Sequence, residues 1–359
     1  MVMIVIKRKC IKLLHRINRS RTTQLFILSS ILQAIIITAL EVRVFHRNND
    51  TSISLVAYAR SSNPSMSCLV PDLFILNNII EENIIFIIFQ IFQMWLCFNA
   101  IYTQNTVQIV TTAAVTFFCA LFAIVQILEV RKWYGNIGKL CQAPLKFESY
   151  PKFLSYDIPL MIALIIFGFI MAFLGWKLYR QLGWNIYKKI GGDINTQAMF
   201  KTYLSYEMLL KLGLFFILGL ALEACIVFKI NLVEHTSINR IRFLPRHFYL
   251  FHIAVTGLTF LIQIIGYRSA KREIKVGMIC LCVFWAAIII DFCILMKYSI
   301  SVKDSWYFFI VFLSIGIIIS FFSLIWSVFV YNNFGRGLKD RLNQKDKEEP
   351  VFYLRYAPI

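Results

Sequence analysis

Charged residues are scarce in this sequence. Only 16% of the 359 residues are Asp, Glu, Lys or Arg, and 59% are hydrophobic, whereas soluble domains are about 25% charged and about 45–50% apolar. Acidic residues are the scarcest, with 19 Asp and Glu against 37 Lys and Arg. With a mean hydropathy of +0.68, the chain carries more apolar surface than one soluble core can bury. This composition excludes an ordinary soluble globular protein.

Motifs of common enzyme classes are also missing. The sequence has no Gly-rich phosphate loop, no G-x-S-x-G elbow and no H-E-x-x-H zinc helix. Its five histidines are scattered, and His247 and His252 are five residues apart, which does not align them on one helix face. We therefore expect no enzymatic activity, no metal site and no cofactor. The basic residues are spread over many short segments, so we expect no nucleic-acid partner.

Long apolar runs are what the sequence does contain. Eight segments approach or exceed the roughly 20 residues that a helix needs to cross the hydrocarbon. They are Leu25–Val44, Ile84–Ile101, Ile109–Leu128, Ile158–Leu178, Tyr206–Phe228, Phe248–Tyr267, Val276–Met296 and Trp306–Val330. The sequence predicts an all-α, polytopic transmembrane bundle of eight spans, or seven if the first or second segment does not cross. We expect a basic N-terminal segment (1–22), a transmembrane domain (23–330) and a flexible C-terminal tail (331–359).

The distribution of basic residues predicts the orientation. Lys and Arg are more numerous in the segments that share a side with the N-terminus, so the positive-inside rule places both termini in the cytosol. The loop after the third span is an exception, with five basic residues on the opposite side. That side also holds Asn49, in an N-D-T glycosylation sequon. It holds Cys68 and Cys141 as well, which either form a disulfide or remain free thiols.

Ionisable residues inside spans are the best candidates for a functional site, because each costs at least about 2.5–3.5 kcal/mol to insert. Glu207 and Lys211 have the i,i+4 spacing of a helical ion pair. Glu223 and Asp291 lie at similar depths, so they either share a cavity and one proton or lie apart. In the second case each faces an aqueous vestibule or pairs with a base such as Lys297. The sequence predicts an intramembrane polar site among these residues.

The stretch between the fourth and fifth spans is distinctive. Residues 176–193 read WKLYRQLGWNIYKKIGGD, and this stretch resembles the hallmark segment of an uncharacterised family of fungal Golgi apparatus membrane proteins. Residues 104–108 (QNTVQ), 209–211 (LLK) and 333–339 (NFGRGLK) are similar to other stretches of that family. The resemblance implies a multi-pass Golgi membrane protein with no established activity. The chain departs from the pattern after Lys211, where an aromatic and an acidic residue are expected and Leu212-Gly213 follow.

The same stretch has the pattern of a basic amphipathic helix on the cytosolic side. Apolar residues recur at steps of three and four, and such helices lie in the headgroup layer against anionic lipids. The alternative is a cytosolic extension of the fourth span that packs on its neighbours. The residues predicted to contact the bilayer and its anionic cytosolic lipids are Trp176, Lys177, Arg180, Trp184, Lys188 and Lys189.

Three hypotheses for function follow. The first is a Golgi membrane protein that acts through membrane and protein interactions, in trafficking or membrane organisation. The alternative is a proton- or cation-coupled transporter that uses the acids buried in spans five and seven. The third is a receptor similar to seven-span receptors.

Overall fold

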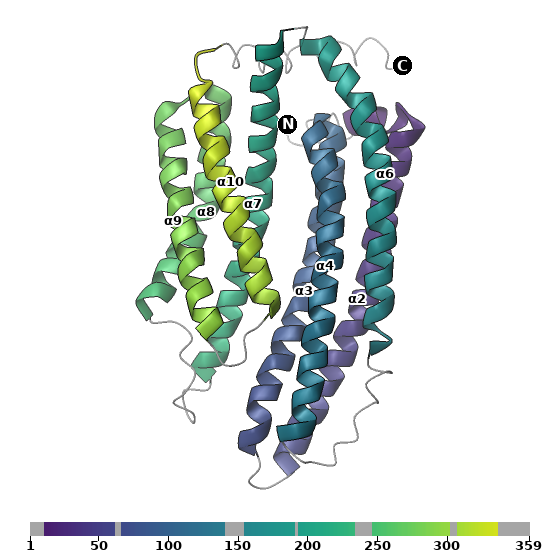
Figure 1. Cartoon of the computed structure of the whole chain (residues 1–359), viewed down its shortest axis with the longest axis vertical. Coiled ribbons are helices and arrows are strands. Elements are labelled where there is room, and N and C mark those ends of the chain that lie inside the picture. Colours follow the sequence, from purple (N-terminus) through teal and green to yellow (C-terminus); the bar gives the residue numbers. More distant parts are fainter. Residues whose placement is uncertain are drawn as a thin grey trace. The chain divides into compact units, whose positions relative to one another are not determined.

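The computed structural model describes residues 11–61, 66–140, 154–190, 193–233, 246–301 and 307–336. All regular secondary structure in these ranges is helical (Figure 1). A short helix covers residues 11–18, and the eight long helices are α2 (Arg21–Ser61), α3 (Met66–Thr103), α4 (Thr106–Leu140), α6 (Asp157–Ile190), α7 (Ile194–Val233), α8 (Arg246–Arg272), α9 (Lys275–Ser301) and α10 (Tyr307–Asn332). Each long helix contains a stretch long and apolar enough to cross a membrane. The chain is a polytopic helical membrane protein, as predicted.

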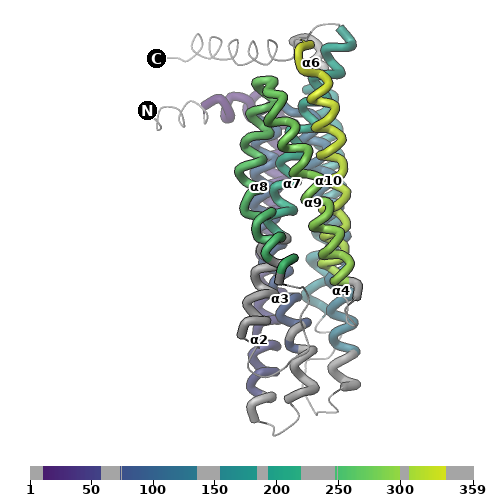
Figure 2. Tube along the Cα trace, turned by 90° about the vertical axis from the view of Figure 1, so that its left-hand side faces the viewer, coloured from purple at the N-terminus to yellow at the C-terminus, as the bar shows by residue number. Residues whose placement is uncertain are grey.

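The chain divides into two compact units. Unit 1 is Met1–Leu182 with Trp306–Phe308, and unit 2 is Gly183–Ser305 with Phe309–Ile359. In unit 1, α2 runs beside α3, and α3 beside α4 (Figure 1). In unit 2, α7 packs beside α8, and α8 beside α9 (Figure 2).

Three helices of unit 1 are much longer than a bilayer requires. The lengths of α2, α3 and α4 are 41, 38 and 35 residues, which correspond to about 50–60 Å at 1.5 Å per residue. Because the hydrocarbon is only about 30 Å thick, these helices extend beyond it. The predicted loop around Asn49 is therefore wrong, since Asn49 lies inside α2. The side chain of Cys68, and Cys141 as a whole, lie outside the described residues.

The buried face of α2 continues through the residues that were predicted to form a loop. This explains why they are helical. Buried side chains recur at steps of three and four residues, a periodicity that keeps one face of a helix against its neighbours. The series runs through Ser30, Gln33, Ile37, Glu41, Val44, Asn48, Ser52 and Leu55. The polar residues beyond Val44 therefore continue a packing face.

Polar side chains in unit 1 face inward and large apolar ones face outward. The buried face of α4 includes Gln108, Thr112 and Thr116, whereas Phe118 and Leu121 are about half exposed. Water would favour the opposite arrangement, while hydrocarbon solvates exposed apolar side chains and favours hydrogen bonds between helices. The distribution therefore indicates that lipid solvates this bundle.

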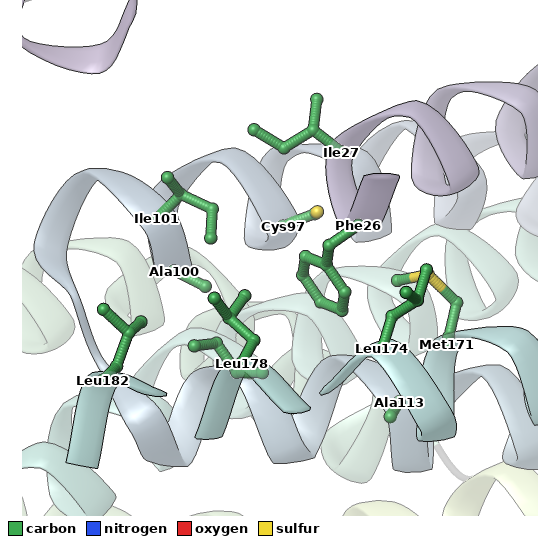
Figure 3. Packing of buried hydrophobic residues seen from close by; sticks show 11 residues of the cluster. Phe26, Ile27, Cys97, Ala100, Ile101, Ala113, Met171, Leu174, Leu178 and Leu182 are labelled. Carbon is green, nitrogen blue, oxygen red and sulfur yellow. The ribbon is translucent and has the colours of Figure 1, made fainter. Parts of the chain in front are cut away.

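One end of unit 1, called here the proximal end, contains helix 11–18 and the start of α2. An apolar cluster joins four helices there (Figure 3), and the partly buried Leu13 and Ile17 of helix 11–18 pack against it. Ser20 caps α2 by accepting a 3.2 Å hydrogen bond from the Thr23 N–H. The labelled members of the cluster are Phe26, Ile27, Cys97, Ala100, Ile101, Ala113, Met171, Leu174, Leu178 and Leu182.

The short turn between α3 and α4 lies at the same end and has polar caps. Gln104 adopts a φ of 52°, the left-handed conformation common at helix C-termini. The Asn105 carboxamide oxygen accepts a 3.1 Å hydrogen bond from the Gln108 N–H and so caps α4.

Close packing in unit 2 accounts for the glycine at position 213. A Cβ at this position would lie 2.5 Å from Cη2 of Trp285 on α9. Because a fully buried indole ring cannot move aside without disturbing its neighbours, any larger residue would separate α7 from α9.

Candidate functional site

A group of buried polar residues lies toward the end of unit 1 opposite the proximal end, called here the distal end. It joins α2, α3, α4 and the first residue of α6, and none of its members is more than 8% exposed. We call it the carboxyl cluster. Its members are Glu41, Arg47, Asn48, Glu82, Asn83, Gln126, Glu129 and Asp157.

Glu41 is held by an amide bridge between α2 and α3. The Asn83 Nδ2 donates a 2.6 Å hydrogen bond to Oε1 of Glu41, and the Asn48 Nδ2 donates a 2.9 Å bond to Oδ1 of Asn83. Gln126 lies beside Glu41. Among the described residues, however, neither Oε2 of Glu41 nor Nε2 of Gln126 has a hydrogen-bond partner. Glu41 is fully buried, so the Asn83 amide takes the place of water at Oε1.

Arg47 provides the one buried guanidinium of the cluster. Its Nη1 and Nη2 donate to the two carboxylate oxygens of Asp157 at 2.5 and 3.2 Å. Its Nε and Nη2 also donate to Oδ1 of Asn48 at 3.2 and 2.9 Å. Asp157 is in the first turn of α6, where a negative charge is also favoured by the helix dipole. This ion pair fastens α2 to the beginning of α6.

Two further carboxyls of the cluster meet between α3 and α4. Glu82 and Glu129 are neighbours, and Oε1 of Glu129 accepts a 2.6 Å bond from the Tyr307 N–H. The Lys132 ammonium lies 4.7 Å from the centre of the Tyr307 ring. Two neighbouring buried carboxylates repel each other, so a proton on one of them stabilises the pair.

Apolar layers enclose the carboxyl cluster along the helix axes. On the proximal side, the rings of Phe86, Phe122 and Phe308 lie with centroids 5.1–6.5 Å apart. On the distal side a second layer closes unit 1, formed by Leu55, Leu76, Ile79, Val130 and Trp133.

The depth of the cluster follows from helix geometry. Glu41 lies about 30 Å along α2 from Arg21 at 1.5 Å per residue, close to one hydrocarbon thickness. If the proximal helix ends lie at one membrane surface, the cluster lies near the other.

The predicted site residues have mixed outcomes. Lys211 donates a 2.8 Å hydrogen bond to Glu207, which confirms that ion pair. The Asp291 carboxylate lies 2.7 Å from Nδ1 of His252, and both side chains are buried. Its basic partner is thus His252 and not Lys297, which is exposed. The side chain of Glu223 lies outside the described residues, so a cavity shared with Asp291 stays a prediction.

The predicted interfacial helix continues α6 without a break to Ile190, and its contact with lipid stays a prediction. The face with Leu178 and Leu182 stays buried past the predicted end of the span, so α6 continues as one helix. Trp176 and Tyr179 are exposed at 54% and 45%, whereas Leu182 is buried. Lys177 is also exposed.

Arg180 is exposed too, and its guanidinium lies 5.2 Å from the centre of the Trp176 ring. The side chains of Trp184, Lys188 and Lys189 lie outside the described ones.

Sequence reasoning missed the carboxyl cluster and His252. Glu82, Glu129 and Asp157 lie one or two residues outside the predicted spans, and we therefore assigned them to loops. One available signal was the recurrence of Gln33, Glu41 and Asn48 on a single face of α2, at steps of eight and seven residues.

No protein-family model matches this sequence, and no curated protein or solved structure matches it either. The resemblance to fungal Golgi membrane proteins therefore stays a prediction. In the part of the chain that the structure describes, no group of three or more His, Cys, Asp and Glu side chains has an arrangement that could hold a metal ion.

Proposed function

We propose that this membrane protein binds and exchanges protons at the carboxyl cluster, as part of a proton-coupled transport activity. The observation that supports this proposal is the proximity of two buried carboxyls, those of Glu82 and Glu129. A proton held between two acids in an apolar enclosure is a recurrent feature of membrane proton relays.

The balance of charge in the cluster supports the same proposal. Four buried carboxyls face one buried guanidinium, from Arg47, and the half-buried ammonium of Lys132. Because the cost of an unpaired buried charge is several kcal/mol, an excess of buried carboxyls over buried cations favours protonation of part of them. Glu41, whose hydrogen-bond donor is the neutral Asn83 amide, is the second candidate proton carrier.

A second candidate function is action through membrane and protein interactions, in trafficking or membrane organisation at the Golgi. It is favoured by the basic residues of the proximal end, which include Lys12, Arg16, Lys177 and Arg180. Under the positive-inside rule this end faces the cytosol. The two functions are compatible, because they use opposite ends of unit 1.

Proton flux through the reconstituted protein tests the first proposal. We expect vesicles that contain the full chain and a pH-sensitive dye to equilibrate an imposed pH gradient faster than protein-free vesicles. Glu82→Gln and Glu129→Gln should each slow this flux at least about tenfold, since an amide keeps the shape of the carboxyl but cannot exchange its proton.

Glu207→Gln is the matched control, because Glu207 pairs with Lys211 in unit 2 and lies outside the cluster. Its flux should equal that of the wild type. Wild-type flux no faster than in empty vesicles, or unchanged flux in both cluster variants, would rule out proton exchange at this site.

A further inference from the structure

Basic side chains at the proximal end of unit 1 are stacked on aromatic rings. The Lys12 ammonium and the Arg16 guanidinium lie 5.2 and 5.9 Å from the centre of the Tyr102 ring, at the end of α3. On α6, the Lys177 ammonium lies 4.5 Å from the centre of the Phe173 ring, and Arg180 stacks on Trp176 as described above. Such contacts hold the cations at defined positions beside rings that favour the membrane interface.

Helix 11–18 lies between the core of unit 1 and its outer surface. Leu13 and Ile17 pack on the apolar cluster, whereas Ile11 and Leu14 are 53% and 58% exposed. The Oγ of Ser20, just after this helix, donates a 3.2 Å hydrogen bond to Oε1 of Gln181 on α6. The exposed apolar residues and the stacked cations therefore occupy one continuous end of unit 1, on helix 11–18, α3 and α6.

The occupant that complements this surface must be both anionic and apolar. Residues 11–33 and 168–182 contain Lys and Arg, and neither these ranges nor residues 90–115 contain Asp or Glu. Beside the cations, Ile11, Leu14 and Trp176 expose apolar surface, which a nucleic acid or an acidic peptide would leave in water. A phospholipid supplies a negative headgroup to the cations and acyl chains to the apolar residues.

We propose that the proximal end of unit 1 is a binding site for anionic phospholipids, with helix 11–18 lying in the plane of that leaflet. The site goes beyond the proposed proton exchange and is independent of it, because it uses no residue of the carboxyl cluster. Lys12 contacts the headgroups beside Tyr102, and Lys177 and Arg180 contact them along α6.

Native mass spectrometry of the full chain tests this site. Detergent-purified protein is mixed with phosphatidylserine or with phosphatidylcholine, which share a phosphate but differ in net charge, and the retained lipid is measured. We expect preferential retention of phosphatidylserine. The variant Lys177→Gln/Arg180→Gln should weaken retention of phosphatidylserine by about thirtyfold, from the contribution of two basic residues at an anionic surface, and leave phosphatidylcholine unchanged.

The matched control is Arg43→Gln/Arg131→Gln, which removes two exposed basic residues toward the distal end of the same unit and should leave retention unchanged. Lys12→Gln provides a second variant, on a different helix, with an expected loss of about fivefold. Equal retention of the two lipids by the wild type, or equal losses in the proximal and distal double variants, would overturn the proposal.

Discussion

Replacing Arg47 by methionine should lower the free energy of unfolding by about 3–5 kcal/mol, the usual cost of removing one partner of a buried ion pair. The substitution leaves the Asp157 carboxylate, which is 2% exposed, without its cation. It also removes the donors that the Asn48 carboxamide oxygen accepts from. The measurement is equilibrium unfolding of the purified protein in mixed micelles with increasing denaturing detergent.

Two further variants separate the ion pair from other effects of the substitution. Arg43→Met removes an exposed arginine from the same helix and should change stability by no more than about 0.5 kcal/mol. Arg47→Met/Asp157→Leu removes both charges, so it should recover most of the lost stability. A double variant as unstable as Arg47→Met, or an Arg43→Met effect of the same size, would show that this ion pair does not hold α2 to α6.

Replacing Asn83 by leucine should cost about 2–6 kcal/mol, because each buried polar group left without a partner costs about 1–3 kcal/mol. The side chains have similar volumes, so packing is nearly conserved. The change leaves Oε1 of Glu41 without its amide donor and Nδ2 of Asn48 without its acceptor. Thermal unfolding followed by circular dichroism in one fixed detergent measures the effect.

Asn99→Leu is the matched control on the same helix. Asn99 is only half-buried, so this variant should unfold within about 0.5 kcal/mol of the wild type. If Asn83→Leu were as stable as Asn99→Leu, the amide bridge would contribute nothing to the cluster.

The sequence predicted interactions within one helix better than interactions between helices. The ion pair of Glu207 and Lys211 follows from their spacing alone, since residues four apart share a helix face. The pair of His252 and Asp291 joins α8 to α9 across 39 residues of sequence. Their contact depends on how two antiparallel helices rotate against each other, which hydropathy does not report.

The ends of the spans were hard to predict for a related reason. Average hydropathy identifies where a chain becomes too polar for lipid, but a buried polar side chain faces other helices and not lipid. Glu82 and Glu129 therefore looked like loop residues, although both lie inside long helices. Glu41 fell inside a predicted span, yet nothing in the sequence identified Asn83 as its partner.

Infrared spectroscopy of the protonated carboxyl groups tests the proposed proton binding most directly. We predict that the purified protein at neutral pH shows a C=O stretching band of protonated carboxylic acids, and that Glu82→Gln and Glu129→Gln each change this band. The Glu207→Gln control should leave it unchanged. A spectrum without this band, or a band that neither cluster variant alters, would contradict the account.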